Sequence, residues 1–336
     1  MSKIANIVAE ASKLSPEAQR KVGSIIGAVV GDAACLHLEW VYDQAKVTKI
    51  VPEGQDPAFW SENHNPFFNM PNGHFSCYAD EAVQSLTAMA ENDGKFDEGK
   101  TITKFLHHFG DPDSPYQVAL AKRKDKKYPI DGPWIQGAMI SMMDRYKADI
   151  KPPGDEDAKE HDGLVTALPL IVQQGFNPDL EGLKKAFQIM TQEPDAILHH
   201  QAEAFLISQF IQGNADPVKA TKEKFSQNDV IVKEITAVEE GKAAGESARD
   251  LVKKFGMACP MPGSFQSSLV SIIGAANYPD AIRETMLCGG DSCSRANMIG
   301  ACLGAKFGIQ GIPSEWMEKV NGMEAIIANS VKCFTK

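Results

Sequence analysis

Apolar residues recur at the spacing of one helix face along most of the chain. The clearest run spans residues 25–30, and similar three- and four-residue spacings occur at residues 83–90, 102–106 and 204–211. Alternation of β-branched residues is scarce. Residues 229–235 are the best candidate for a strand, and they also fit a helix. The pattern predicts an all-α protein with a central, buried helix over residues 25–36.

Proline in or near a first helical turn marks several predicted helix starts, because the first turn does not use the N–H that proline lacks. The four signals are Ser15-Pro16-Glu17, Asp216-Pro217, Tyr278-Pro279-Asp280 and Ile312-Pro313-Ser314. The main predicted loops cover residues 52–77, 152–160 and 257–264, and none is long or polar enough to be a free linker. We therefore expect a single compact domain over residues 1–336.

The charge balance narrows the classes of partner. Lys and Arg total 34 and Asp and Glu total 44, so the net charge is 34 − 44 = −10. Such a chain has no basic surplus to attract a phosphate backbone, and nucleic-acid binding is not expected. The apolar run at residues 25–30 is soon followed by Asp32 and is far shorter than the roughly 20 residues of a membrane span. We expect no membrane partner either.

Cysteine usage indicates the compartment. The seven cysteines are odd in number and none forms a CxxC pair, so neither a disulfide framework nor a structural zinc site is supported. Residues 1–10 show no long apolar core and no cleavage site of a secretory signal. The sequence predicts a reduced, cytoplasmic protein.

Carboxylates at three apparent helix ends are the candidates for chemistry. Asp32 and Glu39 belong to the first, an apolar helix where burial is costly unless each carboxylate is paired or bound to a cation. Asp80 and Glu81 open another predicted helix, where they can cap backbone N–H groups or present hard oxygen ligands to a divalent cation. For both places the alternative is a purely structural role in bonding backbone donors.

The third place is the most specific. Two glycines precede Asp291 in Gly289-Gly290-Asp291-Ser292-Cys293-Ser294-Arg295, and an Ala/Gly-rich helix follows over residues 296–308. The glycines permit a tight turn, and Asp291 and Ser294 are three residues apart, so both can face one point from the first turn. Small residues in the helix predict close contact with another helix.

The remaining polar candidates fit structural roles. The pairs His107-His108 and His199-His200, and His161 alone, lack the spacing that places two imidazoles on one helix face. We expect these histidines to be hydrogen-bonded structural residues, and Arg123 within the basic run 122–127 to lie on a solvated face.

These residues resemble a known family. Gly-Ala-Val-Val-Gly-Asp-Ala at residues 27–33 with Glu39, Ala-Asp-Glu-Ala at 79–82 and Gly-Gly-Asp-Ser-Cys-Ser at 289–294 are similar to three signature regions of the ADP-ribosylglycohydrolases. The resemblance extends from about residue 20 to the C-terminus. It implies a compact orthogonal bundle of helices, two Mg²⁺ ions in a cleft and hydrolysis of a glycosidic bond to ADP-ribose.

By position, the resemblance implies metal ligands at four residues, Asp80, Glu81, Asp291 and Ser294. It also implies that Glu39 orients substrate and water, and that Glu39 or Asp80 acts as the base.

Three departures from the signatures weaken the implied metal site. Ala79 stands where the family usually has a Thr ligand, Glu81 where it has Asp, and Cys293 where it has a ligand Asp. Mg²⁺ prefers hard oxygen ligands in near-octahedral geometry, so losing a hydroxyl and a carboxylate lowers the expected affinity. One ion could be retained by Asp80, Glu81 and Asp291.

The run Gly-Gly-Asp-x-Cys-Ser-Arg resembles one branch of the family, which holds the J-type crystallins of jellyfish lenses and selenoprotein J. This resemblance implies a soluble structural protein with a degraded metal site. Two alternatives remain open at this point. One is a Mg²⁺-dependent hydrolase that takes ADP-ribose or an ADP-ribosylated substrate. The other is redox chemistry at Cys293, whose thiol would be activated by a helix N-terminus and opposed by nearby carboxylates.

Overall fold

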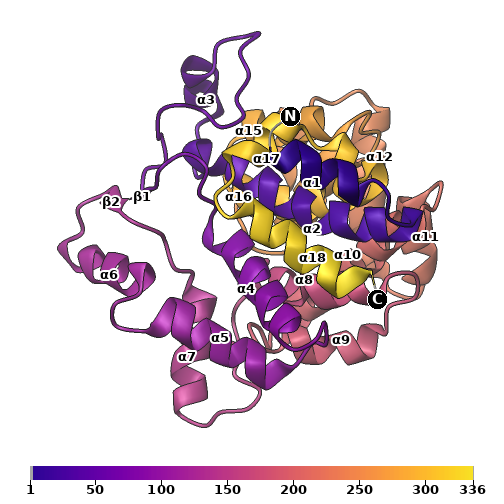
Figure 1. The fold of residues 1–336 in the computed structure, drawn as a ribbon. Helices are drawn as coiled ribbons and strands as arrows, with labels where there is room; N and C mark the ends of the chain where they lie inside the picture. Colours follow the sequence, from indigo (N-terminus) through magenta and orange to yellow (C-terminus); the bar gives the residue numbers. More distant parts are fainter. Residues whose placement is uncertain (1–2, 336) are drawn as a thin grey trace.

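The computed structural model describes residues 3–335, and nearly all of the regular structure in this part of the chain is helical (Figure 1). All four proline signals are confirmed as helix starts, and Ser15 accepts a hydrogen bond from the backbone N–H of Ala18 as an N-cap. The stretch 229–235 is helical, not a strand. In chain order the α-helices are α1 (Lys3–Ala11), α2 (Pro16–Cys35), α3 (Gln44–Ile50), α4 (Cys77–Glu91), α5 (Glu98–Gly110), α6 (Pro115–Lys122), α7 (Gly137–Lys147), α8 (Asp162–Gln174), α9 (Leu180–Phe187), α10 (Pro194–Gln212), α11 (Pro217–Lys224), α12 (Asp229–Ala243), α13 (Ala248–Phe255), α14 (Gly263–Ile272), α15 (Tyr278–Cys288), α16 (Ser292–Phe307), α17 (Ser314–Lys319) and α18 (Met323–Phe334).

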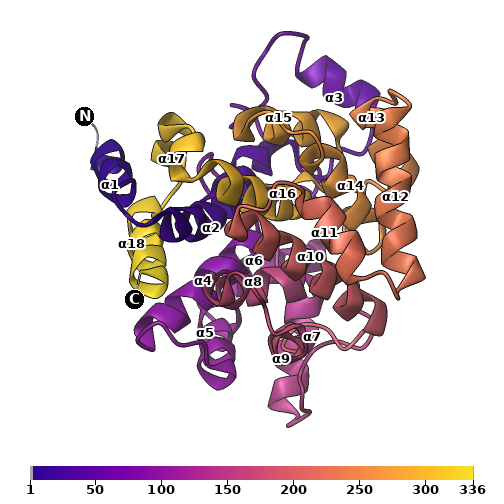
Figure 2. The ribbon, with the colours of Figure 1, turned by 90° about the vertical axis from the view of Figure 1, so that its right-hand side faces the viewer.

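Helices α2 and α16 form the centre of the domain. They lie side by side near the middle of Figure 2, and α4, α8, α10, α14 and α15 pack around them. Their backbones touch at glycines: a Cβ added to Gly27 would lie 2.2 Å from the carbonyl oxygen of Gly300, and one added to Gly304 would lie 2.1 Å from that of Gly23. The predicted central, buried helix is confirmed, and the small residues of α16 serve this contact.

One long helical stretch reopens the question of a membrane span. Residues 16–38 are long and apolar enough to cross a membrane, which the shorter run at residues 25–30 did not indicate. However, 94% of the most apolar window of this stretch is buried inside the protein. The burial explains the composition, because the core helix of a globular domain is apolar on all sides.

A small irregular region lies at one edge of the bundle. Strands β1 (Phe68–Asn69) and β2 (Ile130–Asp131) pair in parallel, with Phe68 opposite Ile130. Figure 1 shows this pair and α6 projecting to the left of the central helices. Three short 3-10 turns complete the described structure: η1 (Leu36–Leu38), η2 (Arg123–Asp125) and η3 (Ile309–Gly311). The chain forms a single compact all-α domain, as the sequence predicts.

Candidate functional site

Glu39 and Asp291 form a buried carboxyl pair where α2 and α16 meet. Glu39 directly follows η1, and Asp291 is the N-cap of α16, with its Oδ1 accepting from the backbone N–H of Ser294 at 3.1 Å. Glu39 Oε2 accepts from Ser292 Oγ at 2.9 Å and from the backbone N–H of Cys293 at 2.8 Å. Both carboxylates therefore lie at the N-terminus of α16, where the helix dipole favours negative charge.

The two carboxyl groups share a hydrogen bond and differ in their affinity for a proton. Burial, followed by the charge of Asp291, raises the pKa of Glu39 well above its ordinary value. Burial also opposes ionisation of Asp291, but hydrogen bonds from Glu39, Trp40 and Ser294 outweigh it and lower the pKa of Asp291. Of the two carboxyl groups, Glu39 is therefore the first to take up a proton, and it is the donor in their hydrogen bond.

Trp40 and Arg295 hold this pair in place. Trp40 donates its indole N–H to Asp291 Oδ2 at 3.1 Å, and its backbone lies in the left-handed region with φ 61°. The backbone N–H of Trp40 donates to the carbonyl oxygen of Gly290. Gly290 and Gly289 form a tight turn, with φ values of 76° and 73°. Arg295 is fully buried and donates to the carbonyl oxygens of residues 257, 285 and 289. These bonds fix the glycine turn that positions Asp291.

Aromatic side chains cover the pair. Trp40 contacts Phe67, Phe68 and Trp134 edge-on, with each ring centroid 5.5 Å away. Arg123 lies 3.4 Å above the ring of Trp134, so it is half-buried over this cover and not on a solvated face as the sequence predicted. The space left beside Glu39, between Trp40, Phe68 and Trp134, is about 10 Å³, roughly enough for one water molecule.

Asp80 belongs to a different group of side chains. Its Oδ2 accepts from His108 Nε2 at 2.7 Å and from the Tyr116 hydroxyl at 2.8 Å, while Oδ1 accepts from Gln84 at 2.9 Å. Asp80 thus connects α4 to α5 and α6. These partners could not be predicted from spacing along the chain, because His108 and Tyr116 are 28 and 36 residues away from Asp80.

Glu81 belongs to a third group, deeper in the core. Its carboxyl group faces Asp162 at the start of α8, and the thiol of Cys77 donates to its Oε1 at 3.3 Å. Burial and the charge of Asp162 raise the pKa of Glu81 well above its ordinary value. For Asp162, burial and the charge of Glu160 raise the pKa to about 7. Oε2 of Glu81 has no hydrogen-bond partner among the described residues. Protonation of either carboxyl would relieve the repulsion between the two groups.

Asp32, the first carboxylate singled out in the sequence, has a structural role. It accepts from the backbone N–H and hydroxyl of Ser76, both at 2.6 Å, and from Asn297 Nδ2 at 2.8 Å. It therefore joins α2 to the N-cap of α4 and to α16, instead of bonding its own neighbours. Burial outweighs these hydrogen bonds and raises its pKa to about 7. Ser76 stands directly before a helix start, so its capping role was readable from sequence.

The substituted positions Ala79 and Cys293 are fully buried. The thiol of Cys293 points to the backbone oxygen of Asp32 at 3.5 Å. Burial, followed by the charges of Glu39 and Asp32, raises the pKa of this thiol well above normal. A protonated, enclosed thiol is a poor nucleophile, and these contacts argue against the redox alternative.

The residues present do not fit the two-ion Mg²⁺ site that the resemblance implies. Mg²⁺ requires near-octahedral oxygen ligands at about 2.0–2.1 Å. The oxygens of Glu39 and Asp291 instead accept bonds from protein donors, and Asp80 and Glu81 accept from other partners. Within residues 3–335, no three or more His, Cys, Asp and Glu side chains are arranged to hold a metal ion.

The structure thus divides the predicted site residues. Glu39, Asp291, Cys293 and Ser294 meet at the start of α16, whereas Asp80 and Glu81 each bond elsewhere. Sequence reasoning did not identify Trp40 and Asp162, which reach Asp291 and Glu81 from distant segments, or the role of Arg295 in fixing the glycine turn.

Comparison with known proteins identifies the family. The sequence profile of the ADP-ribosylglycohydrolases matches residues 14–334, nearly the whole chain. This chain belongs to the ADP-ribosylglycohydrolase family. Among similar proteins, crystallin J1A of Tripedalia cystophora is 27% identical over 312 residues, covering 92% of this chain and 94% of that protein. Crystallin J1B of the same organism is 27% identical over 311 residues, covering 91% and 94%.

Solved structures agree on the fold. One described as an ADP-ribosylglycohydrolase-related protein complex superposes with a TM-score of 0.67 at 18% identity, over 95% of this chain and 98% of that one. The family resemblance and the all-α fold predicted from the sequence are both confirmed. The carboxyl pair of Glu39 and Asp291 is therefore a feature of this member of the ADP-ribosylglycohydrolase family.

Proposed function

We propose that this chain is a crystallin-like structural protein built on the ADP-ribosylglycohydrolase fold, with a degraded metal site. The observation that carries the proposal is the internal pairing of Glu39 with Asp291 beneath an aromatic cover. Their oxygens bind protein donors, and the adjoining space of about 10 Å³ holds one water but no ribose. Similarity to the two J1 crystallins supports the same function.

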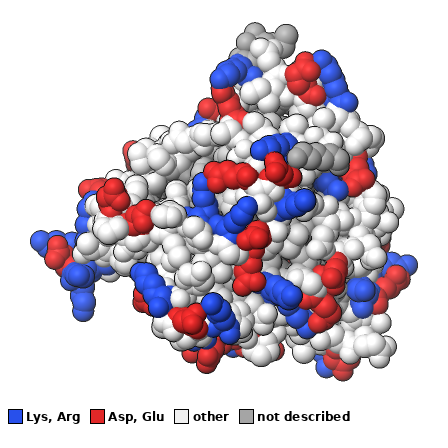
Figure 3. Space-filling model, turned by 60° about the horizontal axis from the view of Figure 1, so that its bottom comes forward, with Lys and Arg blue, Asp and Glu red and all other residues white. Residues whose placement is uncertain are grey.

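The surface suits a protein present at high concentration. Figure 3 shows acidic and basic side chains interspersed over the face in view, without a broad area of one sign. The net charge is −10. Mixed charges with a net charge away from zero favour solubility and disfavour self-association. We further propose a reducing, cytoplasmic location, since the cysteines within residues 3–335 form no disulfide.

The test is ligand binding by the full chain. Isothermal titration with ADP-ribose in the presence of Mg²⁺ should give no saturable heat. An ADP-ribosylated peptide should release no ADP-ribose above the protein-free background, while an active hydrolase of the same fold serves as positive control. Saturable binding together with turnover by the parent chain would overturn the structural function.

A substitution in the aromatic cover can distinguish a site that has lost its metal ligands from a site that the cover merely blocks. Trp134→Ala removes the ring that closes the space beside Glu39, and Tyr128→Ala removes an exposed ring from the same aromatic cluster as a control. A degraded site gains no affinity for ADP-ribose in either variant. Binding gained by Trp134→Ala alone would show that the cover, not the loss of ligands, blocks the site.

The alternative function is hydrolysis of an ADP-ribosylated substrate, and one observation favours it. Burial and the charge of Asp291 raise the pKa of Glu39, and a carboxyl with a raised pKa is suited to general acid catalysis. In that case Glu39→Gln would abolish turnover without changing the affinity for ADP-ribose. The structural function predicts no turnover to lose.

A further inference from the structure

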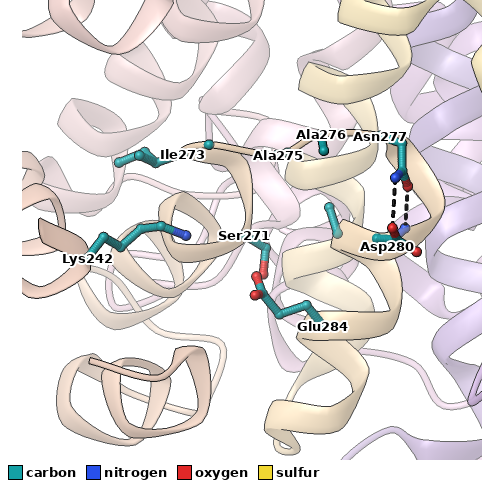
Figure 4. A pocket seen from close by; sticks show the side chains of 10 residues that line it. Lys242, Ser271, Ile273, Ala275, Ala276, Asn277, Asp280 and Glu284 are labelled. Atoms are coloured by element: carbon teal, nitrogen blue, oxygen red, sulfur yellow. Dashed lines mark hydrogen bonds between the residues drawn. The ribbon is translucent and has the colours of Figure 1, made fainter. Parts of the chain in front are cut away.

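A second hollow lies on another part of the surface, and some of its polar groups have no partner within residues 3–335. It has a volume of about 160 Å³ and lies between α12, the end of α14 and α15. Figure 4 shows Lys242, Ser271 and Glu284 directed into it from these three helices. None of its lining residues belongs to the group around Glu39 and Asp291.

Some polar residues of the hollow already have partners. Asn277 caps α15 by accepting from the backbone N–H of Asp280 at 2.8 Å, and its amide donates to the Asp280 carboxylate at 2.7 Å. Lys306 donates to Ala275 O at 2.9 Å and holds the α14–α15 loop. These bonds hold Asn277, Asp280 and the α14–α15 loop in place as one wall of the hollow.

Three polar groups remain available. Ser271 is 2% exposed, yet its hydroxyl has no hydrogen-bond partner among the described residues. Lys242 uses one of its three N–H donors for Val270 O at 2.6 Å. No described side chain forms an ion pair within 4 Å with Glu284. A buried, unpartnered hydroxyl carries a desolvation cost, which a ligand bound beside it would relieve.

We propose that this hollow binds a small zwitterion of the amino-carboxylate class. The carboxylate of the ligand would meet Lys242, its ammonium group would meet Glu284, and Ser271 would bond the ligand between them. A simple anion would be repelled by Glu284 and a simple cation by Lys242, so the pair of opposite charges selects a ligand with both.

The size of the hollow limits the length of the ligand. An apolar cavity of about 150 Å³ holds benzene, which has six non-hydrogen atoms. Short ω-amino carboxylates have five to eight such atoms, a range that suits about 160 Å³. A longer amino acid would extend beyond the hollow into solvent.

The experiment titrates the full chain with glycine, β-alanine, γ-aminobutyrate and 5-aminovalerate, followed by calorimetry and by the shift in melting temperature. Acetate and ethylammonium serve as probes with one charge each. One or two neighbouring members of the series should bind saturably, and the single-charge probes should not. The absence of saturable binding throughout the series would overturn the proposal.

Variants assign the binding to this hollow. Lys242→Met and Glu284→Gln should each weaken the best probe at least tenfold, and Ser271→Ala should weaken it less. Lys233→Met and Glu240→Gln change exposed residues of the same helix, α12, and should bind as the parent does. Equal affinity in Lys242→Met and the parent would also overturn the proposal. A third result would overturn the proposal as well: Lys242→Met lowers the melting temperature, while no probe raises the melting temperature of the parent. The charges of Lys242 and Glu284 would then have a purely structural role.

Discussion

At the scale of single residues, the buried carboxyl groups of this protein fall into two classes. Glu39, Asp32 and Asp162 have raised pKa values because burial outweighs the donors around them. Glu203 behaves oppositely: His161 donates to its Oε1 at 2.7 Å and His200 to its Oε2 at 2.9 Å. Burial opposes its charge, but these two histidines lower its pKa to about 2. The predicted structural role is thus confirmed for His161 and His200, which form a buried network with Glu203.

The network predicts a pH dependence of stability. The folded pKa of Glu203 lies below its ordinary value of 4.5, so its contribution is present above about pH 4.5 and is lost as the pH falls toward 2. A shift of this size corresponds to roughly 3 kcal/mol. Urea unfolding at pH 6, 4 and 3 should show the parent losing more free energy of unfolding than Glu203→Gln does.

The comparison between parent and variant is needed because other groups titrate in the same range. Asp32 and Asp162, with pKa values near 7, take up protons more readily in the folded state and lower its stability as the pH rises from about 4 to 7. Their effect is common to both proteins and cancels in the difference. Parallel losses in the parent and in Glu203→Gln would contradict the assignment.

At the scale of elements, the contact between α2 and α16 is made by backbone against backbone. A Cβ at Gly300 would lie 2.2 Å from the carbonyl oxygen of Gly27, an approach that real side chains do not make. No side chain can rotate away to relieve such a clash, since the obstructing atom belongs to a central helix.

We therefore expect Gly300→Ala to lower the free energy of unfolding by more than about 3 kcal/mol, above the usual 1–3 kcal/mol for overpacking. Gly137→Ala is the matched control, because Gly137 opens α7 with no atom within 4 Å of the added Cβ. Its effect should stay within about 0.5 kcal/mol. Chemical denaturation of both variants measures this, and equal stability of the two would show that the helices can separate at little cost.

Elements differ in how well the sequence predicts them. Helix starts were predictable because capping is local: Ser15 and Pro16 adjoin the turn that they begin. The carboxyl groups were less predictable, since Asp80 reaches α5 and α6, and Glu81 reaches Asp162. Spacing along one helix can show that a carboxylate is near a helix start, but the partner that sets its pKa comes from a segment that tertiary packing brings in.

At the scale of the whole molecule, the reactivity of the thiols measures how well the folded domain shields its cysteines from solvent. Six of the seven cysteines are buried, and Cys259 is partly exposed. Burial and the charge of Asp291 raise the pKa of the Cys259 thiol, so it too reacts slowly at neutral pH.

A thiol-specific reagent should therefore modify about one cysteine in the native protein and all seven in denaturant. Cys259→Ser should remove the native reaction, and mass spectrometry of the labelled peptides identifies the site. Rapid, selective labelling of Cys293 would restore the redox alternative.

The enclosure of these thiols has a consequence over time. A protein that is never replaced collects oxidative damage, and cross-links between chains produce aggregates that scatter light. Here the reaction between chains can begin only at Cys259, as long as the fold stays closed. Ageing of this protein would then follow the rate at which the domain opens rather than the supply of oxidant.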